Sequence, residues 1–184
     1  LKPILMEIDR KICTLHPDMI TALVKQVSIE LSNKTLYKTF ANYFGTNGLF
    51  QLEEYFNKRA EEEELHHKWI SDYLSFNDAT FKYLAVPEND IKIENNLDPF
   101  KATVDREIST TEEINALVEL ALNEKDWATF SWLTGDNDEK GRLCLEQIEE
   151  ESISRSILDL ASEPNTSWLS KQDQIMDFYT ATRG

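Results

Sequence analysis

Apolar and polar residues along most of the chain follow the alternating three- and four-residue spacing of amphipathic helices. This spacing predicts a first helix from Pro17 to about Phe44 and a second from about Leu49 to Phe76. The sequence GTNG at 45–48 predicts the turn between them. Only five glycines and five prolines interrupt the 184 residues, which also favours long helices.

The pattern changes between residues 77 and 97, where Asn, Asp and a proline occur and IKI at 91–93 forms a short alternating run. This segment is predicted to be a long connection with at most a stub of strand. Asp98 and Pro99 then predict an N-cap and the first turn of a third helix, which ends near Lys125.

A fourth helix is predicted to begin after Asp126, which can cap the sequence WATFSWL. The turn sequence TGDND at 134–138 interrupts this helix. The helical pattern resumes by Glu139 and continues to about Ser162.

After a break, Ser167 can cap a short fifth helix that ends near Thr180. Two helices, a long crossover and two more helices predict an all-α fold, an up-down four-helix bundle with a short C-terminal fifth helix. The expected organisation is an N-terminal arm or extension over residues 1–16 and the bundle over residues 17–184.

Each predicted bundle helix has a mostly apolar stripe with a carboxylate near its middle. A buried carboxylate without a partner is strongly unfavourable. Inward-facing carboxylates on four helices of the same bundle therefore indicate that they share a partner, such as a pair of bound cations. From the first helix to the fourth, these carboxylates are Glu30, Glu63, Glu107, Glu146 and Glu150, with Gln147 beside the last two.

Carboxylate oxygens and an imidazole nitrogen are donors that suit Fe(II). Di-iron sites in helical bundles use one glutamate from each of two helices and Glu-x-x-His from each of the other two. Glu30 and Glu107 fit the lone glutamates, and Glu63-x-x-His66 fits one motif because both side chains can point inward. A second such motif is impossible, because none of the three histidines lies in the fourth helix.

The formal net charge is -15, which argues against binding to nucleic acid or to an anionic membrane and suits cations. The two cysteines are far apart in the sequence, so neither a zinc finger nor a disulfide scaffold is expected. No apolar run indicates a signal peptide or a membrane span, and the cytoplasm is the expected compartment.

Four stretches together resemble the ferritin family, of the non-haem bacterial kind. They are LHPDMITALVKQVSIELSNKTLY, RAEEEELHHKWISDYL, INALVELALNEKDWATFSWL and EQIEEESISRSILDL. Their order and separation carry the resemblance, which covers about residues 15–180. The single Glu-x-x-His separates the chain from bacterioferritin and rubrerythrin, which use two, and the second helix has no Met that could bind haem.

The resemblance implies a hollow homo-oligomeric cage of 24 subunits. Such a cage takes up Fe(II), oxidises it with dioxygen at a di-iron ferroxidase centre and stores ferric mineral. By position in the family's pattern, Glu30, Glu63 and His66 match the ligands of the first iron. Glu63, Glu107 and Glu150 match those of the second, so that Glu63 bridges the two.

The same resemblance extends to residues around this centre. Gln147 lies beside the ligands, and Tyr37 matches a tyrosine next to the centre that is a candidate for a catalytic role. Glu62, Glu146 and Glu149 match residues that can hold a third iron nearer the cavity.

Three features depart from the family's pattern. Lys34 lies one turn after Glu30 and Arg59 one turn before Glu63, so either could pair with a carboxylate and displace iron. The fourth helix has about seven extra residues around TGDNDEKGRLCL, which are nearly two helical turns and roughly preserve the facing of the rest of the helix. Arg142 stands where the family has an aromatic residue.

Asp136, Asp138 and Glu139 make this insertion acidic, and we hypothesise that it guides Fe(II) inward, because the region lines the threefold channels of ferritins. The leading interpretation is a ferroxidase and iron store. The alternative is a cage with a degenerate or relocated inner-surface metal site that sequesters iron with little ferroxidase activity, which Lys34 and Arg59 favour. A metal-free, partner-binding helical protein would explain the charge but not the inward carboxylates.

Overall fold

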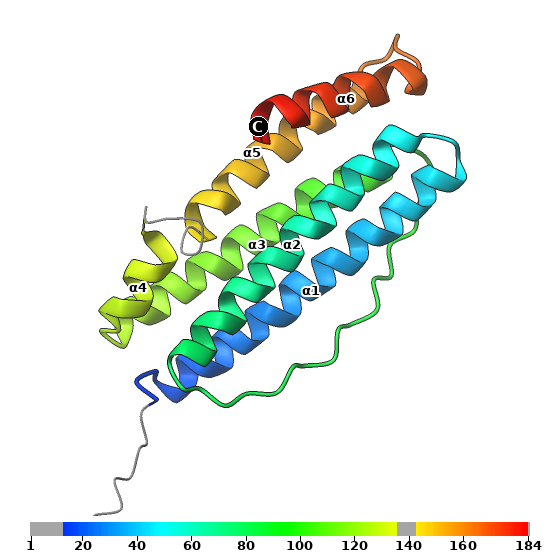
Figure 1. Cartoon of the computed structure of the whole chain (residues 1–184). Helices are drawn as coiled ribbons and strands as arrows, with labels where there is room; N and C mark the ends of the chain where they lie inside the picture. Colours follow the sequence, from blue (N-terminus) through cyan, green and yellow to red (C-terminus); the bar gives the residue numbers. More distant parts are fainter. Residues whose placement is uncertain (1–12, 136–142, 184) are drawn as a thin grey trace, which may run out of the picture.

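The computed structural model describes residues 13–135 and 143–183, and the regular structure of these residues is entirely helical (Figure 1). The all-α bundle and the order of its helices are therefore confirmed, whereas the stub of strand at 91–93 does not form. The helices are α1 (Pro17–Thr46), α2 (Phe50–Phe76), α3 (Asp98–Asn123), α4 (Trp127–Thr134), α5 (Leu143–Ser162) and α6 (Trp168–Arg183).

The start of α1 lies where the sequence predicts it. Pro17 is the first helical residue and His16 is the N-cap. Of the predicted N-terminal arm, the described residues lie against the bundle: Leu15 is buried, and the Thr14 hydroxyl donates to Asn77 Oδ1 over 2.9 Å. The division at residue 16 itself stays a prediction.

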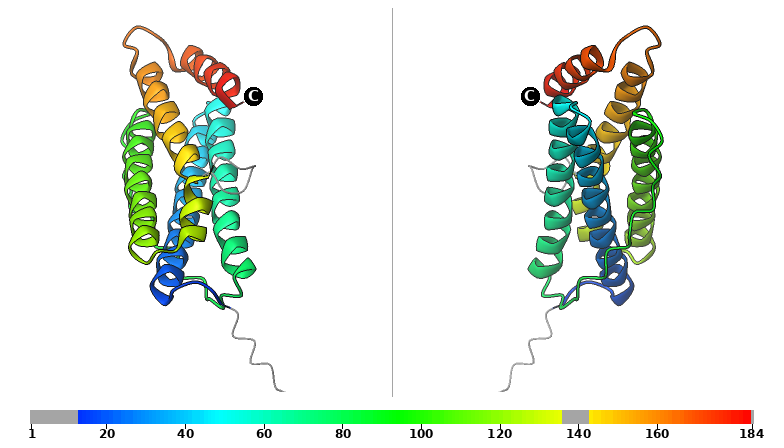
Figure 2. Two further views of the ribbon diagram at one scale, coloured as in Figure 1. Left: turned by 90° about the vertical axis from the view of Figure 1, so that its left-hand side faces the viewer. Right: turned by 90° about the vertical axis from the view of Figure 1, so that its right-hand side faces the viewer.

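The turn between α1 and α2 sets these two helices side by side along most of their length (Figures 1 and 2). Gly48 has a φ of 75°, a conformation that glycine adopts without steric strain. Its N–H donates to Gly45 O over 3.1 Å, and the N–H of Leu49 donates to Phe44 O over 3.0 Å. These two bonds form a Schellman motif, which ends α1 at the predicted place.

The start of α3 differs from the prediction by one residue. Asp98 is the first helical residue, and Leu97 flanks the helix without a side-chain cap. The Asp98 carboxylate instead accepts the backbone N–H groups of Glu94 and Asn95, over 2.9 and 3.0 Å. It therefore fixes the end of the crossover 77–97, which runs along the bundle (Figure 1).

The predicted fourth helix consists of two helices. Asp126 caps α4, since its carboxylate accepts the Thr129 N–H over 3.0 Å, and α4 ends before Gly135. The second piece, α5, is described from Leu143 onward. Two predictions concern residues outside the described part of the chain. One is the acidic loop of Asp136, Asp138 and Glu139, and the other is Arg142, which replaces the family's aromatic residue.

Helix α6 turns back toward the bundle and packs against α5 and α2 (Figure 2). Ser167 caps it as predicted, by accepting the Ser170 N–H over 3.3 Å. Ile175 and Tyr179 of α6 are buried in the core. Because α6 continues to Arg183, the side chain of this residue reaches Glu146 and Glu150 of α5.

The core consists of two apolar clusters with polar side chains buried between them. One cluster includes Phe40, Phe44, Phe56, Phe100 and Ile157, and the other includes Met19, Leu23, Leu74, Ile114 and Leu133. None of the helices in the described part of the chain is long and apolar enough to cross a membrane.

Candidate metal centre

The polar layer between the two apolar clusters contains the six residues predicted to surround an intra-bundle metal centre. Each of them is at most 4% exposed. Four different helices supply them, so the centre depends on bundle packing. They are Glu30 from α1, Glu63 and His66 from α2, Glu107 from α3, and Gln147 and Glu150 from α5. The structure brings the predicted set together, and the role of each residue as a ligand stays a prediction.

Glu30, Glu63 and His66 form the first of two overlapping groups. Each offers a ligand atom that lies within 4.8 Å of the others. Glu30 Oε1 accepts a hydrogen bond from Gln26 over 2.7 Å, whereas Glu30 Oε2 is buried and has no hydrogen-bond partner among the described residues. Buried carboxylate oxygens are normally bonded. Two carboxylates and one imidazole in this buried group fit a divalent iron ion.

Glu63, Glu107 and Glu150 form the second group under the same distance limit, so Glu63 belongs to both. Gln147 orients Glu107 by donating to its Oε2 over 2.8 Å. The Tyr37 hydroxyl donates to the other Glu107 oxygen, Oε1. Tyr37 is therefore next to the centre, as the resemblance implies, through a direct contact with a candidate ligand.

Arg59 occupies the space beside this second group. Its side chain is fully buried. Its Nη2 donates to Glu107 Oε1 over 2.6 Å, and its Nη1 lies 3.3 Å from Glu150 Oε1 and 2.8 Å from Glu62 Oε2. Burial opposes the charge of the guanidinium, yet these three carboxylates hold its pKa well above the ordinary value. The expectation that Arg59 pairs with candidate ligands is therefore met by this geometry.

The parallel expectation for Lys34 is wrong. Its ammonium group pairs with Glu64, and both side chains are partly exposed. Lys34 begins on the inward stripe, but its long flexible stem carries the charge to the surface. No carboxylate of the centre is among its partners in the described residues.

The carboxylates of the centre strongly affect the charge of one another and of His66. Burial and the neighbouring Glu63 raise the pKa of Glu30 well above its ordinary value. Burial also raises the pKa of Glu150, to about 8. Burial alone would lower the pKa of His66, but Glu150, Glu63 and Glu30 raise it to about 10. The metal-free centre thus holds protons that a bound cation would replace.

The three residues predicted to hold a third iron lie beside the C-terminal end of α6. Arg183 lies 3.0 Å from Glu146 Oε2 through Nη1, 3.8 Å from Glu149 Oε2 through Nη1 and 3.1 Å from Glu62 Oε1 through Nε. The Tyr179 hydroxyl donates to Glu62 Oε1 over 2.8 Å. These carboxylates therefore already have a positive partner, and the groups with metal-binding geometry do not include them.

Four site residues escaped the sequence predictions. Gln26 and Asn33 lie on the first-helix stripe four residues before and three residues after Glu30, and that spacing could have indicated them. Asn33 donates toward Glu63 Oε2 over 3.5 Å and to Thr110 over 3.1 Å. Arg183 and Tyr179 have no such signal, because their position depends on how α6 folds back.

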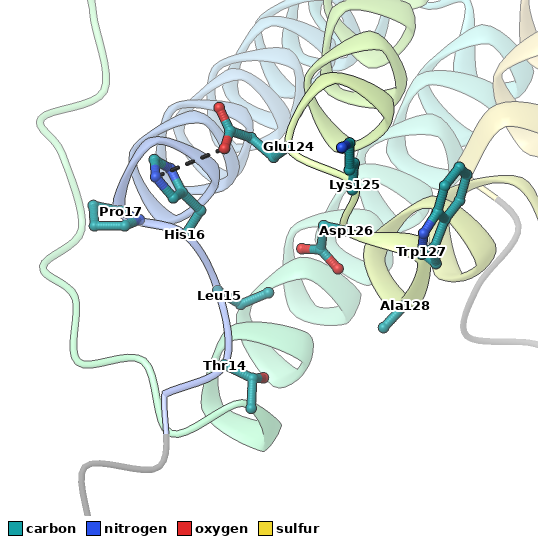
Figure 3. A pocket seen from close by; sticks show the side chains of 9 residues that line it. All are labelled: Thr14, Leu15, His16, Pro17, Glu124, Lys125, Asp126, Trp127 and Ala128. Atoms are coloured by element: carbon teal, nitrogen blue, oxygen red, sulfur yellow. Dashed lines mark ion pairs between the residues drawn. The ribbon is translucent and has the colours of Figure 1, made fainter.

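A third group of possible ligands lies on the surface, at the start of α1. His16 Nε2 is 3.7 Å from Glu124 Oε2, and His16 Nδ1 is 3.8 Å from Asp18 Oδ2. Figure 3 shows His16 and Glu124 at an open pocket of about 610 Å³ between residues 14–17 and 124–128. All three side chains of the group are exposed to solvent, so this group lacks the burial that distinguishes the intra-bundle centre.

The bundle and its buried carboxylate–histidine layer define a ferritin-like protein. A family model for the ferritin-like domain matches residues 20–159, and the chain belongs to this family. It is 29% identical over 145 residues to the bacterial non-heme ferritin of Campylobacter jejuni, covering 79% of this chain and 83% of the relative. With the bacterial non-heme ferritin of Escherichia coli O157:H7 the identity is 28% over 149 residues, or 80% and 86% of the two chains.

Solved structures agree with this assignment. An open pore ferritin from the hyperthermophilic archaeon Archaeoglobus fulgidus superposes with a TM-score of 0.79 at 27% identity. The match covers 88% of this chain and 96% of the archaeal chain. The resemblance to non-haem ferritins that the sequence indicated is thereby confirmed.

Proposed function

We propose that the protein takes up Fe(II), oxidises it with dioxygen at the centre of Glu30, Glu63, His66, Glu107 and Glu150, and stores the ferric product in a cage. Family membership and fold support iron storage in a ferritin cage. The observation that carries the proposal is the buried group of Glu30, Glu63 and His66, whose ligand atoms lie within 4.8 Å of one another and which shares Glu63 with a second such group.

The donor set suits oxidation as well as binding. Carboxylates are hard anionic donors and stabilise Fe(III) more than Fe(II). Two adjacent iron positions can each supply one electron to the same dioxygen molecule. Gln26 and Gln147 hold Glu30 and Glu107 in fixed orientations, by bonds of 2.7 and 2.8 Å. His66 must give up one ring proton before its nitrogen can bind the metal.

The experiment compares two neighbouring glutamates of α2 that receive the same substitution. Glu63→Gln removes the carboxylate that both groups share, whereas Glu64→Gln changes a partly exposed residue that pairs with Lys34. After Fe(II) is added, an oxygen electrode should record rapid consumption for the wild type and for Glu64→Gln. The Glu63→Gln rate should be lower by at least about tenfold. Equal rates in the two variants would place the oxidation elsewhere.

A second candidate function is supported by Arg59. Because this guanidinium already neutralises Glu107 and Glu150, the protein would then retain iron with little ferroxidase activity. The relocated inner-surface site of that alternative has weaker support, since Arg183 contacts Glu62, Glu146 and Glu149. Iron retained on a desalting column without rapid oxygen consumption would favour this second function.

The number of subunits is a separate part of the proposal. A cage of 24 copies would have 24 times the 21.4 kDa mass of the chain. Light scattering coupled to size-exclusion chromatography measures this mass directly, and a dimer as the largest species would contradict the cage. The cytoplasmic location stays a prediction from the sequence.

A further inference from the structure

Arg59 distinguishes the two overlapping metal groups. Its guanidinium bonds to Glu107 at 2.6 Å and lies 3.3 Å from Glu150, and both belong only to the second group. We propose that Arg59 is a built-in cation of the second metal position and lowers the affinity of that position for a metal ion. This inference rests on the proposed function and specifies how its centre is filled.

The first position has no competing cation of this kind. Glu30 accepts a hydrogen bond from the neutral Gln26 amide, and no arginine or lysine of the described residues pairs with it. The nearby positive group is His66, which is itself a candidate ligand and lies 3.9 Å from Glu63 Oε2 through Nδ1. A cation can therefore enter this position without displacing an arginine or a lysine.

The second position requires the guanidinium to move. Glu107 and Glu150 are at most 1% exposed, so their charges depend on nearby positive groups. A divalent cation at these carboxylates would stand close to Arg59, and two positive groups repel strongly in such a buried site. The second cation must therefore displace Arg59, and its apparent affinity is reduced by the work of that displacement.

The structure also provides a place for the displaced guanidinium. Arg59 Nη1 already donates to Glu62 Oε2 over 2.8 Å, and the Glu62 side chain is 20% exposed. Glu62 is three residues after Arg59 on α2, so the two face the same side of the helix. Arg59 Nε has no partner in the described residues, so release from Glu107 and Glu150 leaves the bond to Glu62 and the contact with the Tyr37 ring, whose centroid lies 5.4 Å from the guanidinium carbon. Arg59 can thus move outward without losing every partner.

The test is a titration of the metal-free protein with Co(II) in the absence of oxygen. Calorimetry measures the affinities, and the cobalt absorption spectrum reports the ligands of each bound ion. The wild type should bind one ion tightly at the centre and a second at least about tenfold more weakly. Arg59→Gln should bind the second ion at least about tenfold more tightly than the wild type, with the first affinity little changed. Lys58→Gln, on the adjacent partly exposed lysine that pairs with Glu54, removes the same charge and should behave as wild type.

Two further measurements apply even if Arg59→Gln does not fold. Arg59→Lys keeps a positive charge and should keep the second ion weak. Anomalous diffraction at the cobalt edge, with one equivalent of Co(II), should show a peak at Glu30, Glu63 and His66 while Arg59 still contacts Glu107. Equal affinities for the two ions in the wild type would overturn this inference, and so would a second affinity that Arg59→Gln does not change. Either result would leave the proposed function standing. No ion at the centre in any form would overturn the proposed function.

Discussion

Glu150 Oε1 lies between two guanidinium groups, 3.3 Å from Arg59 Nη1 and 3.2 Å from Arg183 Nη2. One arginine comes from α2 and the other from the end of α6, which are far apart in the sequence. Glu62 also contacts both arginines. The two arginines therefore connect the buried metal centre with the outer carboxylates Glu62, Glu146 and Glu149 in one charge network. A cation that approaches through Glu62 meets these arginines before it reaches Glu150.

The outer half of this network gives the first prediction. Arg183→Gln removes one positive partner from each of Glu62, Glu146 and Glu150, so these carboxylates should attract cations more strongly. We expect the variant to bind additional Mn(II) ions at a class of weak binding sites that the wild type lacks. Calorimetric titration of the metal-free protein measures this class.

Arg155→Gln is the matched control. Arg155 is exposed and pairs with Glu151 on the outside of α5, so its loss changes the net charge equally without touching the network. This control should titrate as wild type. If both variants gain the same weak binding, the effect is one of net charge, and the specific role of Arg183 is refuted.

The second prediction concerns the pH dependence of the metal-free protein. His66 has a pKa of about 10 in the folded chain, whereas a histidine in an unfolded chain has a pKa of about 6.5. Because the folded pKa is the higher one, the imidazolium contributes its full stabilisation below pH 6.5 and loses it as the pH rises toward 10. The free energy of unfolding should therefore decrease by more than about 1 kcal/mol between pH 7 and pH 9.

Urea denaturation at the two pH values, followed by tryptophan fluorescence, measures this decrease. In His66→Gln the decrease should be smaller, and the remainder should come from Glu150, whose pKa of about 8 lies in the same pH range. His67→Gln, a change in the neighbouring residue that lies beside Glu64, should keep the wild-type decrease. A His66→Gln protein that loses as much stability as the wild type would show that other groups cause the pH dependence.

The sequence was sufficient to predict the bundle and the inward carboxylates, because helical spacing specifies which face of a helix each residue occupies. It does not specify where a long side chain ends. Lys34 and Arg59 both lie one turn from an inward glutamate, but Lys34 reaches Glu64 at the surface, whereas Arg59 stays among three carboxylates. The rigid, planar guanidinium bonds several carboxylates at once, which an ammonium group on a flexible stem does less readily.

The position of α6 could not be predicted for a different reason. Its contacts with the centre join residues far apart in the chain, such as Tyr179 with Glu62 and Arg183 with Glu146. Local periodicity predicts that a helix forms near residue 168 but contains no information on its packing partner. The pairing of Glu62, Glu146 and Glu149 with Arg183 therefore could not be predicted, and their role as ligands of a third iron stays a prediction.

The third prediction separates two roles for Tyr37, which are simple core packing and the catalytic role that the resemblance implies. Its hydroxyl donates to Glu107, and its ring packs against Phe40 and Phe56. Tyr37→Phe keeps the ring and removes one donor from Glu107, so stability should fall by only about 1 kcal/mol. We expect oxygen consumption after addition of Fe(II) to slow several-fold, while the number of bound Co(II) ions is unchanged.

Tyr43→Phe is the control on the same helix. The Tyr43 hydroxyl bonds to Asn96 at the crossover, away from the centre. This variant should keep the wild-type rate. If Tyr37→Phe also keeps that rate, the residue serves packing alone.

The last prediction concerns the junction of α3 and α4, where Lys125 has a φ of 56°. Its N–H donates to Leu122 O over 3.1 Å, and the N–H of Asp126 donates to Ala121 O over 2.8 Å, so Lys125 is in the left-handed position of a Schellman motif. A side chain with a Cβ is strained there by roughly 1 kcal/mol. Glycine relieves this strain but gains freedom in the unfolded chain, so Lys125→Gly should raise the free energy of unfolding by about 0.5 kcal/mol.

Urea denaturation of the metal-free protein detects a change of this size when Lys125→Ala is measured in parallel. Alanine keeps the Cβ and, like glycine, lacks the rest of the exposed lysine side chain, so the difference between the two variants reports mainly on the left-handed backbone. Asp78, with a φ of 55° at the end of α2, provides an independent repeat through Asp78→Gly. If Lys125→Gly and Asp78→Gly both destabilise the protein, the polar side chains at these helix ends contribute more than the left-handed backbone costs.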